Sequence, residues 1–413
     1  FVSGGAAMQE QPKKKKKQAP DPLHSLIVVG GGAAGLMAAI QAAQQGVSVT
    51  ILEHNEKTGR KICVTGNGRC NLTNLNQYKE AYRGTNPDFA SGVFRQFSVT
   101  DTLDFFEKIG ILTVEKKGWL YPRSGQAKSV SELLEAKARS LKVKIKTREH
   151  VTKVFQKDGL WNVRTEGWTY QGAAVILANG SKASSVSGSD GSGYEIAATL
   201  GHQIIPPLPA LLGLKCRDRG FSSWSGVRTE GRLTLLIDGV PQKEEEGELQ
   251  LTEYGISGIP VFQLSRYAVR ALSEKKKAAL RINFFPEYTE EELRALLENR
   301  KKLCPYQTEP ELLTGLLPDK LIKVLMKQKD PLGSACGFEL EITGNTGFEQ
   351  AQVCSGGVDT SQVDPMTLES RLHKGLFFAG ELLDIDGACG GYNLQWAWSS
   401  GAAAGIHGAK EII

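Results

Sequence analysis

Cysteine and histidine form none of the short patterns in this sequence that hold a metal ion or a redox-active pair. The seven cysteines include no CxxC, and Cys63 and Cys70 have six residues between them. The six histidines include no pair spaced i, i+4. These absences argue against a zinc ribbon, a thioredoxin-like site and a helical metal site. We therefore expect free thiols buried in the core and no bound metal.

Long apolar runs are absent as well. No run reaches the roughly 18 residues that are needed to span a bilayer. The apolar run at Leu26–Gly30 follows a lysine-rich segment, but it is too short for a secretion signal and ends in glycines. We expect a cytoplasmic protein without a membrane span.

Excess charge is confined to one segment near the start of the chain. The formal net charge is +5, and Lys13–Lys17 account for all of it. Residues 1–22 contain three prolines and few bulky apolar side chains, which predicts a flexible basic arm. The part before Met8 is interpreted as a remnant of cloning. Because no aromatic or arginine residues interleave the lysines, we expect a solvated tail rather than a nucleic-acid site.

A glycine-rich turn follows the first apolar run. Gly30-x-Gly32-x-x-Gly35 stands between a strand at Leu26–Val29 and a small-residue helix, and a second strand follows at 47–53. This βαβ context predicts a turn that binds the pyrophosphate of a dinucleotide at a helix N-terminus. Glu53, at the end of the second strand, is placed to accept hydrogen bonds from the adenosine ribose. Its charge would repel a 2′-phosphate, so NADP is disfavoured at this turn.

A second glycine-rich segment near the other end of the chain indicates which dinucleotide binds. The strand-like run GLFFAG at 375–380 leads to Gly380-Glu381, then to the loop Gly387–Gly391 and a final small-residue helix. Reduced flavin carries negative charge on its pyrimidine side, and the positive end of a helix would offset it. We therefore predict FAD rather than NAD. The cations and small polar residues at 59–71 are predicted to wrap the pyrophosphate and the edge of the flavin.

The length of 413 residues and a change of character near residue 206 predict a chain of several parts. Helices are predicted to begin at capping-box patterns at Ser98 and Ser129, and strands at 143–147, 151–156, 160–165 and 173–178. Residues 23–205 and 346–413 are assigned to a discontinuous FAD-binding domain. Residues 206–345 are assigned to an insert, β-barrel-like at 206–287 and 330–345 and helical at 288–329.

Five segments, among them GRKICVTGNGRCNLTN and CGGYNLQWAWSSG, resemble in order a bacterial flavoprotein family. Its members are described as aminoacetone oxidase family proteins or NAD(FAD)-utilising dehydrogenases, and the bile-acid-inducible flavin reductase is a relative. The resemblance covers about residues 25–408. It implies an α/β fold: a glutathione-reductase-like, FAD-binding Rossmann domain with an inserted β-barrel-like and helical domain.

The resemblance also implies a set of FAD contacts. Carried over by position, they are Gly30, Gly32, Ala33, Ala34, Gly35, Glu53, Arg60, Lys61, Gly68, Arg69, Cys70, Asn71, Val151 (through its backbone), Ala178, Gly180, Gly380, Glu381, Asp384, Gly391, Tyr392, Asn393 and Leu394. Two positions depart from the family pattern. Asn67 replaces a glycine, and the stretch 178–181 reads ANGS rather than ATGG. Asn tolerates positive φ better than most residues, so the turn at 67 is expected to survive.

Nothing in the sequence resembles a second nucleotide-binding turn between a strand and a helix. A nicotinamide donor would therefore have to dock transiently against the flavin. Candidate catalytic residues are Tyr392, Cys389 and Asn71, with Asp386 as a further possible proton source.

We expect an FAD-dependent oxidoreductase that acts on a small organic substrate, with NAD(P)H as transient donor. An amine oxidase that uses O₂ and an FAD-carrying, RNA-associated factor are the alternatives. No motif in the insert identifies the substrate.

Overall fold

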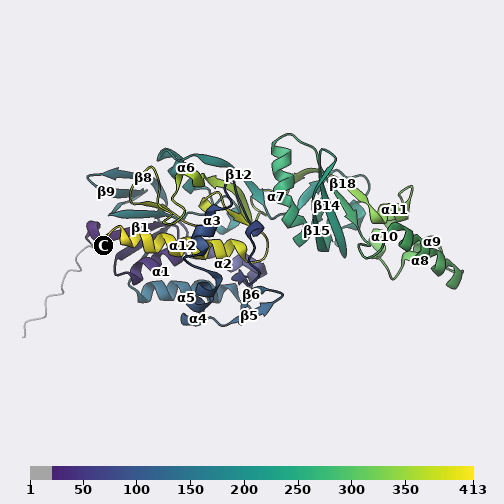
Figure 1. The fold of residues 1–413 in the computed structure, drawn as a ribbon, viewed down its shortest axis with the longest axis horizontal. Coiled ribbons are helices and arrows are strands. Elements are labelled where there is room, and N and C mark those ends of the chain that lie inside the picture. Colours follow the sequence, from purple (N-terminus) through teal and green to yellow (C-terminus); the bar gives the residue numbers. More distant parts are fainter. Residues whose placement is uncertain (1–20) are drawn as a thin grey trace, which may run out of the picture.

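The computed structural model describes residues 21–413, so the arm expected at 1–22 lies almost wholly outside the described residues. Figure 1 shows an elongated molecule with a larger α/β unit at one end, a small barrel beside it and a group of helices at the far end. Within residues 21–413, no helix has both the length and the apolar character needed to cross a membrane.

Runs of apolar, often β-branched residues form a parallel sheet at the centre of the larger unit. In spatial order its strands are β20 (Leu376–Phe378), β11 (Ala174–Leu177), β1 (Ser25–Val29), β2 (Ser48–Glu53) and β7 (Lys144–Thr147). Each strand pairs in parallel with its neighbour in the sheet. The strands β20, β11 and β1 are buried along their whole length because both faces of the sheet are covered, whereas the edge strand β7 is mostly exposed.

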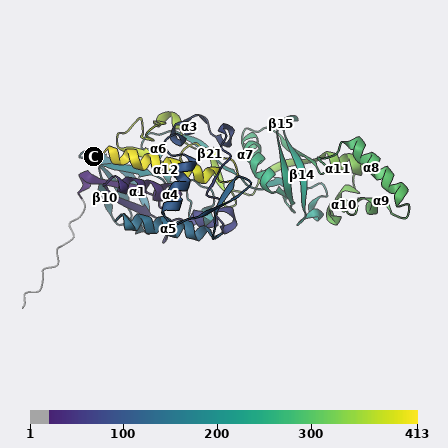
Figure 2. The same ribbon diagram turned by 60° about the horizontal axis from the view of Figure 1, so that its bottom comes forward.

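Helices rich in small residues pack along this sheet, and α12 (Tyr392–Lys410) lies against α1 (Ala33–Gln44) in both views. Figure 2 shows α5 (Ala127–Ser140) on the side of α1 that faces away from α12. The remaining helices of this unit are α2 (Arg60–Val64), α3 (Phe89–Phe94), α4 (Val99–Lys108), α5 (Ala127–Ser140) and α6 (Ser192–Thr199).

The two capping-box predictions have different outcomes. Ser98 caps α4, because its side chain accepts from the Asp101 amide while Asp101 accepts from the Ser98 amide. The prediction at Ser129 is wrong. Helix α5 begins earlier, with Gln126 as the extended residue before it, and Ser129 lies inside the first turn.

Smaller antiparallel sheets flank the central sheet. One is a three-stranded meander, and another is a two-stranded sheet whose strands lead into and out of the barrel. The meander consists of β8 (Val151–Lys157), β9 (Leu160–Thr165) and β10 (Thr169–Gly172), and the two-stranded sheet of β12 (Ile204–Ala210) and β19 (Val353–Val358). A third sheet consists of β3 (Thr73–Asn74), β5 (Thr113–Lys116) and β6 (Trp119–Pro122), and a fourth of β4 (Tyr82–Arg83) and β21 (Asp386–Gly387).

The insert is a closed six-stranded barrel with its own apolar core. In spatial order its strands are β13 (Leu214–Cys216), β16 (Gly255–Ser257), β15 (Val240–Leu251), β14 (Arg228–Ile237), β17 (Ala278–Asn283) and β18 (Phe338–Asn345). A long helix, α7 (Ile259–Ser273), lies within the stretch that was expected to be β structure. It begins at Ile259, with Pro260 in its first turn, and its apolar residues pack against the barrel core. This packing stabilises a helix where β structure was expected.

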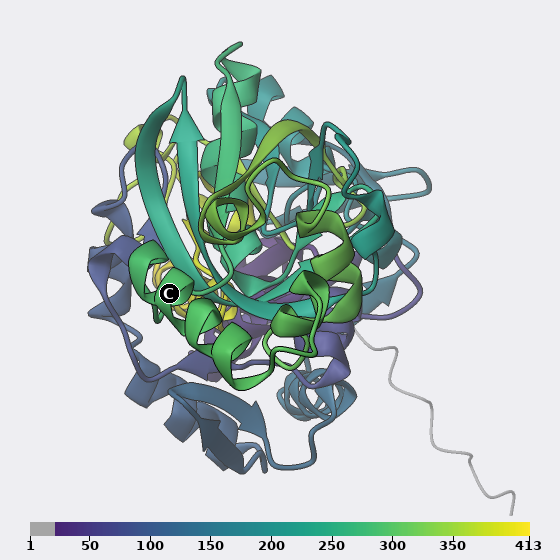
Figure 3. The same ribbon diagram turned by 90° about the vertical axis from the view of Figure 1, so that its right-hand side faces the viewer.

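Four helices lie between β17 and β18 in the chain and form the far end of the molecule. They are α8 (Glu290–Leu303), α9 (Glu309–Leu313), α10 (Asp319–Leu325) and α11 (Pro331–Cys336). Figure 3, viewed from that end, shows them in front of the barrel strands. Helix α11 lies in the stretch 330–345 that was assigned to the barrel, so the helical part extends a few residues further than predicted.

Candidate functional site

The glycine-rich turn has the close backbone contacts that the sequence requires. A Cβ on Gly30 would lie 2.3 Å from the Ala178 carbonyl oxygen, and one on Gly35 would lie 1.9 Å from the Gly30 oxygen. A Cβ on Gly32, by contrast, would meet no atom within 4 Å. The first and third glycines therefore let strand and helix pack, and the second leaves open space in front of the α1 N-terminus.

Glu53 is fixed beside that turn. Its carboxylate is 5% exposed and accepts hydrogen bonds from the Gly31 amide at 2.7 Å and from the Asn55 amide and side chain, both at 2.8 Å. These charge-assisted bonds hold the carboxylate in one orientation at the end of β2. The same side chain lines a large pocket.

This pocket, which we call the central pocket, contains about 1300 Å³ of empty space, part of it open to solvent. It is formed where the carboxyl ends of β1, β2, β11 and β20 meet the N-termini of α1 and α12, the usual ligand edge of an open α/β sheet. The predicted site residues that line it are Gly32, Ala33, Ala34, Glu53, Arg60, Lys61, Asn71, Ala178, Gly180, Gly380, Glu381, Cys389, Gly391, Asn393 and Leu394.

Eight predicted residues do not line the central pocket: Gly30, Gly35, Gly68, Arg69, Cys70, Val151, Asp384 and Tyr392. The carboxylate of Asp384 is buried and accepts from the Thr85 amide at 2.8 Å. The Cys70 thiol lies in the apolar core, where burial raises its pKa to about 12. Gly30 and Gly35 act through packing, as described above.

Tyr392, predicted as a catalytic residue, points away from the pocket. Its hydroxyl donates to the Asn76 carbonyl oxygen at 2.7 Å, and its ring meets Tyr78 and Tyr82 edge-on. The side chain is 4% exposed, and burial raises the pKa of its hydroxyl. The ring of Tyr392 packs against other aromatic rings and its hydroxyl is hydrogen-bonded to the backbone. The geometry of this side chain therefore does not support the catalytic prediction.

The N-terminus of α12 opens onto the pocket. Gly390 and Gly391 have φ values of +116° and +93°, and Gly391 is the residue before the first helical turn. The first turn of a helix leaves backbone amides without acceptors inside the helix. The Asn393 side chain is occupied with the preceding loop, since it bonds to the Gly387 amide and carbonyl and to the Ala388 carbonyl. Asn393 can therefore serve a ligand through its backbone.

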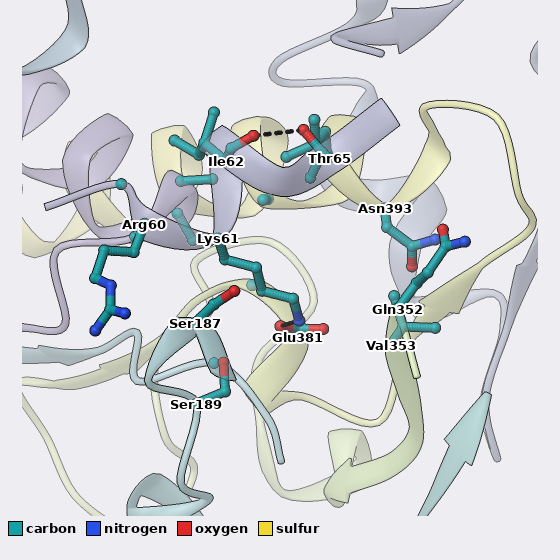
Figure 4. Close-up of a pocket in the computed structure, with 18 of the residues that line it drawn as sticks. Arg60, Lys61, Ile62, Thr65, Ser187, Ser189, Gln352, Val353, Glu381 and Asn393 are labelled. Atoms are coloured by element: carbon teal, nitrogen blue, oxygen red, sulfur yellow. Dashed lines mark hydrogen bonds and ion pairs between the residues drawn. The ribbon is translucent and has the colours of Figure 1, made fainter. Parts of the chain in front are cut away.

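Figure 4 shows the positions of the charged side chains Arg60, Lys61 and Glu381 in the central pocket. Arg60 lies at one end, where it donates to Asn55 Oδ1 at 2.7 Å and to the Val186 carbonyl at 3.2 Å. Lys61, on α2, reaches across to form an ion pair with Glu381. Asn393 lies at the other end, facing Gln352.

Asn71 and Cys389 lie in the part of the pocket near the start of α12. Asn71 is 7% exposed, and among the described residues neither its Nδ2 nor its Oδ1 has a hydrogen-bond partner. Cys389 donates its backbone amide to Gln263 Oε1 at 3.0 Å. Burial raises the pKa of its thiol to about 11, which keeps the thiol protonated at neutral pH.

The cysteines are all free, and all seven lie within the described residues. Cys70, Cys216 and Cys354 are buried, whereas the other four are partly exposed. The expectation of buried thiols therefore holds for three of them.

Several pocket residues were not predicted from the sequence. Trp119 and Tyr121 lie on β6, and Leu211, Gln352 and Val353 come from the β12 and β19 region. Trp119 and Tyr121 are spaced i, i+2 in a strand, so they share one face. That alternation was visible in the sequence, but nothing local indicated that the face borders this pocket.

The substituted turn keeps the geometry that its glycine would adopt. Asn67 has φ +53° and ψ +46°, the left-handed conformation that was expected to survive. Gly180, in the altered ANGS stretch, has φ +77°.

The pocket residues fit an FAD group. The space in front of Gly32 leaves room for phosphate oxygens at a helix N-terminus. The buried side-chain amide of Asn71 has an unused donor, Nδ2, and an unused acceptor, Oδ1. The edge of a flavin ring offers both acceptors and a donor, so this amide could bond to it. The α12 N-terminus supplies a second partial positive charge across the same pocket.

Comparisons with known proteins show which family the chain belongs to. The family model described as "HI0933-like protein Rossmann domain" matches residues 24–407. The chain is 44% identical to a 3-dehydro-bile acid delta(4,6)-reductase of Clostridium scindens, over 92% of this chain and 97% of that protein. It is 31% identical to a ribosomal RNA dihydrouridine synthase of Haemophilus influenzae, over 92% and 96%.

Solved structures are similar over most of the chain. A flavocytochrome c3 fumarate reductase in an open conformation matches with a TM-score of 0.47 and 15% identity, over 98% of this chain and 85% of that one. A 3-ketosteroid-delta4-(5alpha)-dehydrogenase from Rhodococcus jostii matches with a TM-score of 0.48 and 16% identity, over 94% and 97%. From the family model and the sequence relatives, the chain belongs to the HI0933-like family of FAD-binding Rossmann proteins and is an FAD-dependent oxidoreductase.

Proposed function

We propose that this enzyme reduces a carbon–carbon double bond conjugated to a carbonyl group in a small organic substrate, with NAD(P)H as transient donor. The names of two full-length relatives support this class of reaction. One is named a delta(4,6)-reductase of a 3-dehydro-bile acid, which denotes reduction at double bonds that start at positions 4 and 6 of a compound with a ketone at position 3. A dihydrouridine synthase saturates a double bond conjugated to the carbonyl of a uracil ring.

The observation that carries the proposal is the wall of the central pocket beside the α12 N-terminus. Aromatic and apolar side chains from three separate elements meet there: Trp119, Tyr121, Leu211 and Val353. Leu211 is 1% exposed and Val353 4% exposed, so this wall is firmly packed. A flat organic ring would contact such a wall on one face and the flavin on the other.

FAD, when bound, supplies the hydride-transfer chemistry. The pyrophosphate would lie at Gly32, Ala33 and the α1 N-terminus. Glu53 would accept from the ribose, and the α12 amides at Gly391 and Leu394 would face the pyrimidine edge. Asn71 would give the flavin or substrate the hydrogen bonds that its amide otherwise lacks.

Cys389 is the proposed proton donor. Reduction of a conjugated double bond requires a proton at the carbon that does not receive hydride. The Cys389 thiol lines the pocket and holds its proton at Sγ at neutral pH, because burial disfavours the thiolate. The backbone bond from Cys389 to Gln263 fixes the position of this residue.

Anaerobic stopped-flow spectroscopy tests the two halves separately. NADH or NADPH should bleach the flavin faster than a buffer control, and a 3-oxo-4-ene steroid should then restore its absorbance. Cys389→Ser should slow the second step at least tenfold and leave the first unchanged. Bleaching no faster than the control would contradict the nicotinamide donor. Rapid bleaching by amines would favour the amine oxidase instead.

Uridine in RNA is a second candidate substrate. Two relatives with that activity in their names, at 31% and 28% identity, match over 92% of this chain. Ribosomal RNA incubated with enzyme and NADPH should then contain dihydrouridine by mass spectrometry. Deleting residues 8–20, which lie outside the described residues, should weaken salt-dependent RNA binding if the lysine arm is the anchor. Unchanged binding would contradict that role.

A further inference from the structure

A second cavity adjoins the central pocket on the hairpin of β5 and β6. It contains about 1230 Å³ of empty space, part of it open to solvent, and we call it the basic cavity. Its cations are Arg69, Lys116, Lys117 and Arg123, and it shares the side chains of Trp119 and Tyr121 with the central pocket. Figure 1 shows this hairpin at the edge of the larger unit.

The hairpin places these groups on one face. Lys116 is paired with Trp119 and Val114 with Tyr121 in the antiparallel ladder, and all four side chains line the basic cavity. The tight turn at Lys117 and Gly118, with φ values of +53° and +85°, fixes this register. An aromatic surface and a cation are therefore held side by side at a distance set by the strands.

The charge of the cavity is uncompensated. No carboxylate lines it, and none of its four cations takes part in an ion pair within residues 21–413. All four are exposed. By contrast, Lys61 in the central pocket is paired with Glu381. Four unpaired cations around one hollow give a positive potential that attracts a multivalent anion.

Trp119 and Tyr121 lie between the basic cavity and the central pocket, because both side chains line both spaces. A Cβ built on Gly390 would lie 3.0 Å from the Trp119 ring, so Trp119 packs against the loop that precedes α12. A ligand with phosphates in the basic cavity needs to pass only Trp119 and Tyr121 to bring an aromatic ring beside Cys389. A reduced nicotinamide dinucleotide has this combination of phosphates and a flat ring.

We propose that the basic cavity binds the phosphates of the nicotinamide dinucleotide donor while its nicotinamide end enters the central pocket. This inference rests on the proposed function. Exposed, flexible lysine and arginine side chains give weak, salt-sensitive binding, which suits a donor that must leave before the substrate enters. It also explains how a chain with one glycine-rich nucleotide turn can use a second dinucleotide.

The test is a titration of FAD-loaded enzyme with NADP⁺, which binds without reducing the flavin. The variant Lys116→Gln/Arg123→Gln removes two cavity cations and no hydrogen-bonded core group. Its Kd for NADP⁺ should rise about five- to tenfold, and the dependence of Kd on salt should become shallower. The matched control Lys108→Gln/Lys157→Gln changes the same charge at exposed residues that line neither cavity, and should bind as the wild type does.

The outcomes separate the inference from the proposed function. Weaker NADP⁺ binding by the cavity variant supports phosphate binding in the basic cavity, whether or not NADPH bleaches the flavin. Failure of NADPH to bleach the flavin contradicts the donor role that the proposed function assigns to the dinucleotide. Equal binding by the cavity variant and the wild type, or no measurable binding by the wild type, overturns the inference. A uridine-containing oligoribonucleotide is titrated in parallel. If the cavity variant loses RNA binding but binds NADP⁺ as the wild type does, the donor assignment is overturned. The basic cavity would then bind the phosphates of a nucleic acid.

Discussion

Asn71 shows how a single buried side chain can be arranged for a ligand rather than for the fold. Its amide is buried in the pocket wall, yet neither its oxygen nor its nitrogen has a partner among the described residues. Each buried polar group without a partner costs about 1–3 kcal/mol. Asn74, only three residues away, is also buried but donates to the Gly390 carbonyl at 2.9 Å and accepts from the Asn76 amide at 2.8 Å.

Asn71→Leu, which keeps the side-chain size, should therefore have opposite effects on the two states of the protein. The apoprotein should become more stable by about 1–2 kcal/mol, because an unsatisfied amide is removed. FAD should bind at least tenfold more weakly, as measured by flavin fluorescence. Asn74→Leu is the matched control and should destabilise the apoprotein. A loss of apoprotein stability in Asn71→Leu would contradict a ligand role.

His202 makes stability depend on pH. It is 3% exposed, its Nε2 lies 2.8 Å from the Ser370 hydroxyl, and its ring meets Phe378 edge-on. Burial lowers the pKa of the ring to about 4, with His373 contributing as a second cause. The folded protein therefore holds His202 neutral at pH values where the unfolded chain would protonate it.

Between about pH 6.5 and 4 the unfolded state binds the proton and the folded state does not, so stability falls as pH falls. This histidine should remove up to about 1.4 kcal/mol of unfolding free energy per pH unit in that window. Urea denaturation of wild type and His202→Gln at about pH 7, 6, 5 and 4.5 measures the difference. The variant should show the shallower dependence, and parallel curves would contradict the buried neutral ring.

At the scale of elements, the packing of α12 on α1 decides how the two ends of the chain form one site. A Cβ on Gly401 would lie 2.4 Å from the Ala34 carbonyl oxygen, and one on Gly405 would lie 2.3 Å from the Ala38 oxygen. These glycines, one turn apart, let the backbone of α12 rest directly on α1. Both helices direct their N-termini to the central pocket, so this contact also sets the spacing of the two helix ends.

Gly405→Ala should destabilise the protein although alanine is the better helix former. Helix propensity alone would gain about 1 kcal/mol. The new methyl group would meet backbone that cannot move aside, and overpacking of this kind costs about 1–3 kcal/mol. We expect a net loss of up to about 2 kcal/mol by chemical denaturation, with reduced FAD content. The control Gly167→Ala has no atom within 4 Å of the added Cβ and should be nearly neutral.

At the scale of the whole molecule, a buried ion cluster joins the barrel to the larger unit. Arg266, on α7, donates through Nε to both carboxylate oxygens of Asp386, at 2.9 and 2.8 Å. Arg83 Nη2 lies 3.3 Å from Asp386 Oδ2 and forms a second ion pair with the same carboxylate. Asp386 is 1% exposed and both arginines are 9% exposed. Asp386, a candidate proton source in the sequence, is therefore committed to this junction. Because α7 also holds Cys389 through Gln263, the barrel helps to position the loop before α12.

Arg266→Met should cost about 3 kcal/mol, because removing one partner leaves a buried carboxylate with poorer compensation. The same variant should loosen the barrel, which small-angle X-ray scattering would detect as a change in the radius of gyration. Arg232→Met is the matched control, since Arg232 forms an exposed pair with Glu246 and should lose less than about 1 kcal/mol. Equal losses in the two variants would contradict a special role for the junction.

The sequence by itself determined the parts whose signals are local. The first βαβ unit, the cap at Ser98, the left-handed turn at Asn67 and the final helix all follow from patterns within one element, because periodicity and backbone conformation depend on neighbouring residues. The glycine-rich turn and the late return to the sheet were sufficient to predict FAD, and the resemblance of five segments indicated the family.

Only the tertiary structure decided which side chains share the pocket. Tyr392 and Asp386 looked reactive in the sequence, but packing turned one toward Asn76 and placed the other between two arginines. Trp119 and Val353, which carry no motif, became walls of the site because β6 and β19 pass beside it. Such contacts join residues hundreds of positions apart, and their energy depends on burial and geometry that no local stretch of sequence contains.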